Sequence, residues 1–206
     1  MKWKVCGMRD VQNCEEVAQF NPDLMGFIWA KKSPRYVGED FVIPASIPHH
    51  IQKVGVFVDE SVEKIIDLSK SAGFTWVQLH GEEGDLEIER LKKAGLKVIK
   101  AISVATKSDV EEVNRFTILP DYFLFDTKKG AQVGGTGERF DWGILDAYSL
   151  DVPIILAGGL DEENLAEAIQ LSKKYPIEVL DFNSKLEVSP GMKKVSRVSR
   201  VSEVLK

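Results

Sequence analysis

Val54-Gly-Val-Phe-Val58 is followed, after a short connection, by Ser61-Val-Glu-Lys-Ile-Ile-Asp-Leu-Ser-Lys70. The first segment is apolar throughout, as expected for a strand of a parallel sheet that is covered on both faces. The apolar residues of the second segment lie largely along one face of a helix, and Gly73 ends that helix. Together the two segments predict a strand–helix unit, and the architecture depends on how often this unit recurs.

Units of the same kind recur along the whole chain. Candidate strands begin near Lys2, Leu24, Lys53, Trp76, Lys97, Tyr122, Ile154 and Ile177. Successive starts are 21 to 32 residues apart, a period that suits one strand, one helix and two short loops. Eight such units without a change in composition predict a single α/β domain over residues 1–206, a small (β/α)8 TIM barrel. A doubly wound open sheet is the alternative, but it needs fewer units, and no Gly-x-Gly-x-x-Gly signature follows the first strand.

The segments between the strands are predicted to be helices. Beyond the first unit, they cover residues 85–93, 107–116 and 162–174. Acidic residues 161–163 would face the positive end of the last helix. The second helix is the irregular one: Pro44 and Pro48 interrupt the segment between Tyr36 and Gln52, so we expect a short or broken helix there.

The composition limits the possible partners. The chain has 206 residues, 44% of them hydrophobic, and a net charge of −5. This acidic balance, without a basic stripe, argues against nucleic acid as a partner. The basic cluster from Lys193 to Arg200 recurs at helical spacing and is interpreted as a solvated helix face. No leader segment and no apolar run of ~18 residues is present, so we predict a cytoplasmic protein without a membrane partner.

Cys6 would lie at the carboxyl end of the first strand, before the break at Gly7 and a helix that Asp10 can cap. Cys6 and Cys14 form neither a disulfide framework nor a metal spacing, which fits a reduced compartment. In parallel α/β folds this edge of the sheet carries the chemistry. A lone cysteine is more often a small buried hydrophobe, so its interpretation depends on its neighbours.

The other strand ends supply those neighbours, because all strand ends of a barrel meet at one mouth. They carry Arg35, Asp59, His80, Ser103, Asp126 and the segment 181–184. A thiol, a guanidinium, an imidazole and carboxylates would therefore surround a single opening. His80 is interpreted as a hydrogen-bonding residue, and no metal site is predicted because no zinc or calcium spacing occurs in the sequence.

Two further segments favour a phosphorylated substrate and a functional loop. Gly158 and Gly159 would offer backbone N–H groups beside a helix start, next to the loop after the eighth strand, where barrels commonly hold phosphate. The alternative is that the two glycines only form a tight turn. The segment from Thr127 to Arg139 is long and glycine-rich, as in a lid or a disordered loop, and it lacks the Lys-Ser/Thr of a nucleotide loop.

Taken in order, the motifs at these positions resemble those of phosphoribosylanthranilate isomerase over essentially the whole chain. They are Lys4-Val-Cys-Gly7, Gly26-Phe-Ile with Ser33-Pro-Arg35, Val54-Gly-Val-Phe-Val58, Val77-Gln-Leu-His-Gly81, Phe125-Asp126, Gly134-Gly-Thr-Gly-Glu-Arg-Phe-Asp-Trp142, Ala157-Gly-Gly-Leu160 and Ser189-Pro-Gly191. The resemblance implies an Amadori rearrangement in tryptophan biosynthesis. N-(5′-phosphoribosyl)anthranilate becomes 1-(2-carboxyphenylamino)-1-deoxyribulose 5-phosphate, without a metal or organic cofactor.

The resemblance also implies a role for each site residue. Cys6 matches the general base, Asp126 the general acid and Arg35 the residue that binds the anthranilate carboxylate. The remaining substrate-binding positions are Gln78, His80, Gly158, Gly159, Asp181, Asn183 and Ser184. A thiol has a reference pKa of ~8.5, so we expect a modest downward shift to make Cys6 a base near neutral pH, while a raised pKa would suit Asp126. The expected partner is a small phosphoribosyl substrate, bound by a monomer or homodimer.

The loop after the eighth strand departs from the family pattern. The family reads Asp-x-Ser-Ser-Gly-Val-Glu, whereas this chain has Asp181-Phe-Asn-Ser-Lys-Leu-Glu187. Lys185 would be strained if the family glycine needs a positive φ, or it would add a cation to the phosphate site. Two other functions stay open. One is an isomerase for the histidine-pathway aminoimidazole compound, whose relatives use paired aspartates, so Cys6 argues against it. The other is a non-catalytic phosphate-binding barrel.

Overall fold

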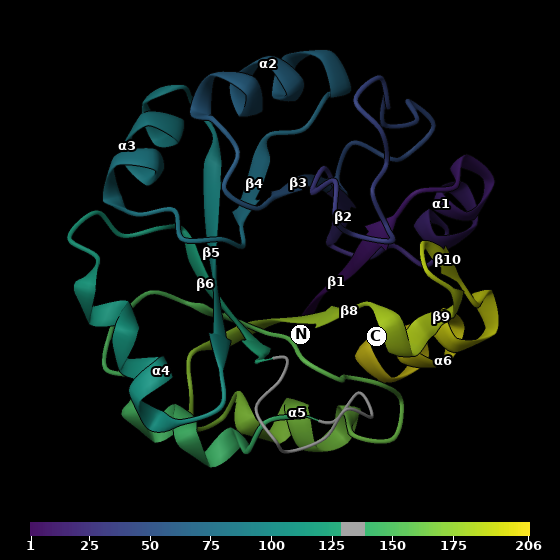
Figure 1. Cartoon of the computed structure of the whole chain (residues 1–206). Helices are drawn as coiled ribbons and strands as arrows, with labels where there is room; N and C mark the ends of the chain where they lie inside the picture. Colours follow the sequence, from purple (N-terminus) through teal and green to yellow (C-terminus); the bar gives the residue numbers. More distant parts are fainter. Residues whose placement is uncertain (129–138) are drawn as a thin grey trace.

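Eight parallel strands close into a barrel in the order β1 to β8, surrounded by helices (Figure 1). This is seen in a computed structural model that describes residues 1–128 and 139–206. The strands are β1 (Lys2–Met8), β2 (Leu24–Ile28), β3 (Gln52–Phe57), β4 (Trp76–Leu79), β5 (Lys97–Val104), β6 (Tyr122–Thr127), β7 (Ile154–Leu156) and β8 (Ile177–Phe182). Each begins within a residue of its predicted start, and the prediction of a (β/α)8 barrel is confirmed.

The helices follow the strands as in the predicted repeat. They are α1 (Val11–Ala18), α2 (Val62–Ala72), α3 (Asp85–Lys93), α4 (Lys107–Glu111), α5 (Leu165–Leu171) and α6 (Val195–Leu205), with 3-10 turns η1 (Glu112–Arg115), η2 (Trp142–Ala147) and η3 (Ser184–Leu186). A short antiparallel hairpin, β9 (Glu187–Ser189) and β10 (Met192–Lys193), follows η3. Asp10 accepts a 2.8 Å hydrogen bond from the Asn13 N–H and caps α1 as predicted.

Two helices differ from their predictions. Residues 29–51 are all described and contain turns but no helix, because Pro44 and Pro48 each start a turn that closes on the N–H of Ile47 or Ile51, at 3.1 Å in both cases. The expected broken helix is therefore replaced by a packed loop. The last predicted helix starts late, at Leu165, because Asp161 and Asn164 exchange side-chain-to-backbone hydrogen bonds that hold residues 161–164 in a turn.

Side chains alternate between the two faces of the closed sheet. The inner face is filled by small and branched apolar side chains, among them Leu24, Val54, Val56, Ile99, Ala101, Leu124, Ile155, Ala157 and Val179, together with Cys6. The outer face packs larger residues such as Trp3, Phe27, Phe57, Phe123 and Phe182 beneath the helices. The interior of the barrel is thus a packed core.

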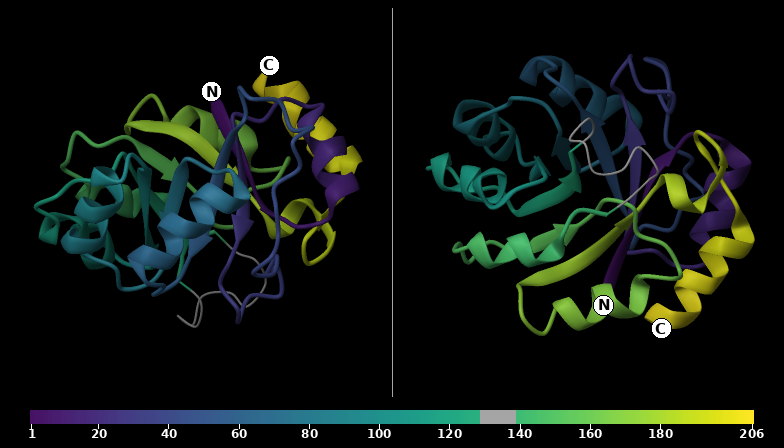
Figure 2. Two further views of the ribbon diagram at one scale, coloured as in Figure 1. Left: turned by 90° about the horizontal axis from the view of Figure 1, so that it is seen from above. Right: turned by 60° about the horizontal axis from the view of Figure 1, so that its bottom comes forward.

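Both chain termini lie at one end of the barrel (Figure 2, left). Because β1 starts there and all eight strands are parallel, the carboxyl ends of the strands meet at the opposite end. In the part of the chain that the structure describes, no helix has the length and apolar character needed to span a membrane. Residues 129–138, which make up most of the segment expected to be either a lid or a disordered loop, lie outside the described residues.

Candidate active site

Cys6 lies on the inner face of β1, and its sulfur fits against Gly26 of β2. A Cβ on Gly26 would lie 2.8 Å from the Cys6 Sγ atom, so the bare backbone of β2 makes the room for the thiol. Cys6 is 4% exposed. Burial raises the pKa of the Cys6 thiol, although the nearby charge of Lys4 acts to lower it. The expected downward shift is therefore wrong, because desolvation outweighs the cation.

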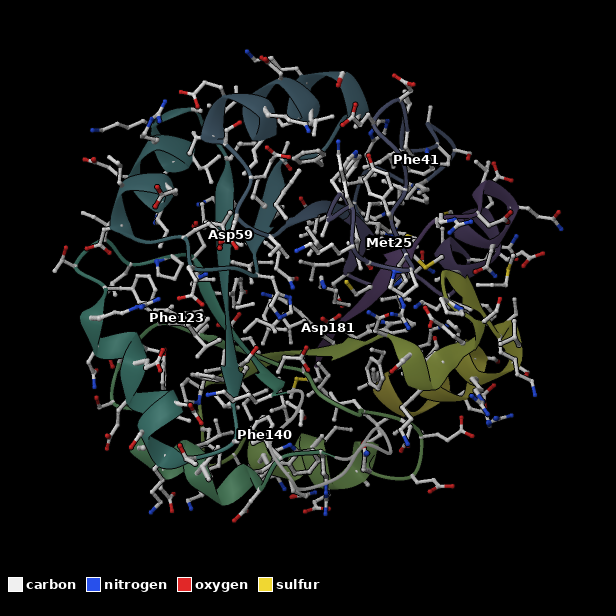
Figure 3. The ribbon with its side chains drawn as sticks, in the orientation of Figure 1. Met25, Phe41, Asp59, Phe123, Phe140 and Asp181 are labelled. Atoms are coloured by element: carbon white, nitrogen blue, oxygen red, sulfur yellow. The ribbon has the colours of Figure 1, made fainter. Side chains whose placement is uncertain are left out.

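Lys4 lies directly below Cys6 and was not predicted to belong to the site. Its Nζ is 3.0 Å from Asp181 Oδ2, and the two residues are partners in the register between β1 and β8. The Lys4 side chain is fully buried, and Asp181 is only 8% exposed. The second carboxylate oxygen of Asp181 is also buried, without a hydrogen-bond partner in the described residues. Figure 3 shows Asp181 near the centre of the ring of strands.

Gln78, His80 and Asp126 lie at the ends of β4 and β6. Gln78 Nε2 is 3.3 Å from His80 Nδ1, and His80 Nε2 is 3.8 Å from Asp126 Oδ2. Burial, helped by the positive charges of Lys4 and Lys100, lowers the pKa of His80 to about 4, so this ring is neutral at neutral pH. The Gln78 Oε1 atom, like Asp181 Oδ1, is a buried acceptor without a partner in the described residues. Such acceptors are available to hydroxyl groups of a ligand.

Asp126 is the more open carboxylate. Its side chain is 34% exposed, and its Oδ1 accepts a 2.8 Å hydrogen bond from the Thr127 N–H. The negative charge of Asp126 adds to the effect of burial in raising the pKa of Asp181, so the two carboxyl groups face a common space. The strand alternation places Cys6, Asp126 and Asp181 on the inner side of the same mouth.

Arg35, in the loop after β2, is held by Glu187 at the start of β9. Arg35 Nε donates to Glu187 Oε1 at 2.8 Å and Nη2 donates to Oε2 at 2.5 Å, a two-point contact along one edge of the guanidinium. The edge formed by Nη1 and Nη2 is left for a second carboxylate, and Nη1 makes no hydrogen bond to the described residues. The aliphatic part of Arg35 crosses Gly7, where a Cβ would lie 2.6 Å from Cδ. Arg35 is thus carried to the position next to Cys6.

Lys193 completes this anchor. Its ammonium group donates to Glu187 Oε1 at 2.7 Å and to the Asn183 Oδ1 atom at 2.9 Å. The Lys193 side chain is fully buried, so the interpretation of this residue as part of a solvated face is wrong. Burial lowers the pKa of Lys193. Burial would raise the pKa of Glu187, but hydrogen bonds from Arg35 and Lys193 hold it below its ordinary value.

The glycine turn after β7 has left-handed backbone at both residues, with φ of +88° at Gly158 and +68° at Gly159. A Cβ on Gly158 would collide with Thr127, so this turn requires glycine. Asn164 holds the turn by donating to the Gly159 carbonyl at 2.9 Å. Because α5 begins only at Leu165, the predicted helix end does not adjoin the glycines, and their own N–H groups are the available donors.

The loop after β8 lies beside this turn. Ser184 starts η3, and Lys185 within it has no positive φ, so the strain considered for Lys185 is absent. The Lys185 ammonium is instead 3.8 Å from Asp161, which follows the glycine turn, and its side chain is 38% exposed. The cation is therefore next to the candidate phosphate site. The side-chain oxygen of Asn183 points toward Lys193 and not toward Ser184.

A second buried ion pair fixes the ends of β3 and β4. Lys100 of β5 is 2.9 Å from Glu83, whose carboxylate accepts hydrogen bonds from the N–H groups of Asp59 and Gly81. Asp59 has a φ of +51° and accepts from the Glu82 N–H, so its carboxylate caps the neighbouring loop (Figure 3). These contacts hold the backbone directly after His80 in place.

The sequence matches a known protein family over nearly its whole length. The sequence profile of N-(5′-phosphoribosyl)anthranilate isomerase matches residues 3–204. The chain belongs to this family. It is 39% identical over 194 residues to the enzyme of that name from Petrotoga mobilis, covering 93% of this chain and 90% of the relative. It is 38% identical over 198 residues to the Parabacteroides distasonis enzyme, covering 95% and 89%. The chain is thus an isomerase of tryptophan biosynthesis, as the resemblance implied.

Solved structures of the family share the fold. Phosphoribosyl anthranilate isomerase from Thermus thermophilus superposes with a TM-score of 0.84 at 25% identity, covering all of this chain and 98% of that one. Another, in complex with reduced 1-(o-carboxyphenylamino)-1-deoxyribulose 5-phosphate, gives 0.78 at 26% identity, with 98% and 97% covered. Monomers generated from the dimeric Thermotoga maritima enzyme give 0.81 at 28% identity, with 98% and 96% covered.

Proposed function

We propose that this chain converts N-(5′-phosphoribosyl)anthranilate to 1-(2-carboxyphenylamino)-1-deoxyribulose 5-phosphate, with Cys6 as general base and Asp126 as general acid. The observation that carries the proposal is the single polar mouth. Cys6 and Asp126 come from β1 and β6, the fully buried Lys4 lies below Cys6 and pairs with the nearly buried Asp181 of β8, and Gln78 and Asp181 offer buried acceptors without a partner in the described residues. A sugar with several hydroxyl groups would satisfy these acceptors.

Asp126 performs the first step in this scheme. Its carboxyl group gives a proton to the ribose ring oxygen, the bond from that oxygen to C1′ breaks, and the nitrogen lone pair forms the Schiff base. Asp126 suits this role because it is more exposed than Asp181 and can regain its proton from solvent. His80, 3.8 Å away and neutral, does not compete as a charged acid at neutral pH.

Cys6 then removes the proton from C2′, and the electrons of that C–H bond move toward the nitrogen to give the enolamine. Tautomerisation of the enolamine gives the ketone product. A positioned base or acid of this kind typically contributes about 10²–10⁴-fold to the rate. Cys6 needs to be a thiolate for this step, although burial raises its pKa. The charge of Lys4 is the nearest feature that acts in the opposite direction.

The two ends of the substrate would be held on either side of the acid and base. The free guanidinium edge of Arg35 fits the anthranilate carboxylate, because its partner Glu187 already fixes the plane of the group. The N–H groups of Gly158 and Gly159, with Ser184 and the ammonium of Lys185, would hold the phosphate. Binding energy from these distant groups orients the sugar for proton transfer.

The test follows the loss of anthranilate fluorescence with the purified chain and with three variants. Cys6→Ala and Asp126→Asn should each lower kcat by about 10²-fold or more. Cys14→Ala, which removes a thiol on the outer side of the barrel, should keep the activity of the unmodified chain. Full activity of both site variants would refute the assigned roles. Turnover of the histidine-pathway aminoimidazole compound in place of this substrate, or substrate binding without turnover, would refute the proposed reaction.

A further inference from the structure

Three groups that can each carry a charge meet inside the barrel below the mouth. Lys4 and Cys6 are two residues apart on β1 and therefore point to the same inner face. Asp181 is next to Lys4 in the β1–β8 register, with 3.0 Å between Lys4 Nζ and Asp181 Oδ2. None of the three is more than 8% exposed. One buried cation, Lys4, therefore lies close to two groups that can become anions, Cys6 and Asp181.

Gly26 of β2 lies against both Lys4 and Cys6. The position that a Cβ would take on Gly26 is 2.8 Å from Cys6 Sγ and 3.3 Å from Lys4 Cε. The sulfur and the last carbon of the lysine stem thus contact the same bare segment of β2. The ammonium group lies between the sulfur of β1 and the carboxylate of β8.

The charges do not balance when both acids are ionised. With Asp181 ionised and Cys6 protonated, Lys4 and Asp181 form a neutral pair. Removing the Cys6 proton to solvent would then leave an extra negative charge in the barrel interior, which is costly away from water. Neutrality is kept if the thiolate forms while Asp181 takes up the proton. Burial raises the pKa of both Cys6 and Asp181, and the charge of Lys4 acts to lower both, so the two acids compete for one cation.

We propose that Lys4, Cys6 and Asp181 form one titrating unit, in which Cys6 becomes a thiolate by passing its proton to Asp181 beside a permanently charged Lys4. The S–H bond breaks, an O–H bond forms on the carboxylate, and the number of protons in the unit is unchanged. Lys4 and Asp181 are then positioning residues for the base, since they act through Cys6. The inference deepens the proposed function and rests on Cys6 as its base.

Other charged groups surround the unit and are the same in all variants below. They are Lys193 of β10, Arg35 of the β2–β3 loop, their partner Glu187 and Asp126 of β6. His80 after β4 faces Lys4 and Asp181 as well, and is neutral at neutral pH. Because these groups are unchanged, they cannot cause opposite changes in the thiol pKa when Asp181 and Lys4 are replaced. Such opposite changes would therefore come from the three residues of the unit.

The test measures the pKa of the Cys6 thiol without substrate, by the ultraviolet absorbance of the thiolate against pH, in a Cys14→Ala background. Burial raises the pKa of Cys14 to about 12, and its removal leaves one thiol to titrate. Asp181→Asn should lower the Cys6 pKa by about 1–3 units, because Lys4 then faces the thiol alone. Adding Lys4→Met to Asp181→Asn should raise it again by a similar amount. The double variant is used because Lys4→Met alone would leave a buried carboxylate without its cation.

Glu178→Gln is the matched control. Glu178 is on β8 as well, but it pairs with Lys2 and Tyr122 at the opposite end of the barrel, so the thiol pKa should stay unchanged. An unchanged or higher thiol pKa in Asp181→Asn would overturn the shared proton. Equal values in the single and double variants would show that Lys4 does not act on the thiol and would also overturn it. This experiment measures the thiol pKa and no turnover. The proposed role of Cys6 as general base is tested separately, and an active Cys6→Ala variant would refute it.

Discussion

Replacing Gly26 with alanine should lower kcat and leave KM nearly unchanged. The new methyl group would lie 2.8 Å from Cys6 Sγ and 3.3 Å from both Cys6 Cα and Lys4 Cε. Non-bonded carbon atoms pack at ~3.5–4.0 Å, so the sulfur would have to move by about 1 Å or rotate away from the mouth. The strand itself need not change, because Gly26 is not among the glycines with positive φ.

The expected size of the effect follows from this displacement. A misplacement of about 1 Å at a reacting group can cost on the order of 10²-fold in rate, so kcat should fall about 10²-fold. KM should change little, because the atoms nearest to the new methyl group belong to Cys6 and Lys4 rather than to Arg35 or the Gly158 turn. The added methyl group also overpacks the barrel interior, which should lower the free energy of unfolding by about 1–3 kcal/mol.

Steady-state kinetics by anthranilate fluorescence and urea unfolding measure these quantities. Gly84→Ala is the matched control: its nearest neighbouring atom would be 3.9 Å from the new Cβ, and its backbone is extended, so kinetics should match those of the unmodified chain. A Gly26→Ala variant with unchanged kcat would show that the position of the Cys6 sulfur does not limit the reaction. A rise in KM with unchanged kcat would contradict the separation of the two sites.

Two further substitutions probe the buried charges. Glu187→Gln leaves the buried Lys193 without an anion, so urea unfolding should show a loss of about 3–5 kcal/mol, and KM should rise as Arg35 loses its anchor. Glu178→Gln, at a partly exposed pair, should cost about 1 kcal/mol or less, and equal losses would contradict the buried charge. His80 has a folded pKa of about 4 against ~6.5 when unfolded, so between these pH values only the unfolded chain binds the proton, and stability falls as pH falls. When the free energy of unfolding is measured between these two pH values, the fall in stability should be smaller in His80→Asn than in the unmodified chain, by up to about 3 kcal/mol. Parallel curves of unfolding free energy against pH would show that the ring is not desolvated.

The strands could be predicted from sequence because each is a short apolar run and the runs recur with one period. The order of the barrel follows from that repeat, and the polar strand ends follow from the barrel. Helix ends were less predictable. Asp161 and Asn164 form a turn through hydrogen bonds between the side chain of each and the backbone N–H of the other. These bonds compete with the backbone hydrogen bonds of a helix, which could also form at these residues. The position of Lys4 was available from the alternation along β1, since it shares the face of Cys6.

The buried partners of Lys4 and Arg35 could not be predicted from sequence, because each of these two pairs joins distant segments. Lys4 and Asp181 are 177 residues apart, and Arg35 and Glu187 are 152 apart. A lysine is normally exposed, so its burial becomes plausible only when such a partner is known. The same reasoning explains the departure at Asn183. Its side-chain oxygen accepts from Lys193, which binds Glu187, which in turn holds Arg35. The change of a family serine to asparagine therefore belongs to the anchor of Arg35, the proposed carboxylate-binding residue, and Lys185 is the change that lies beside the proposed phosphate site.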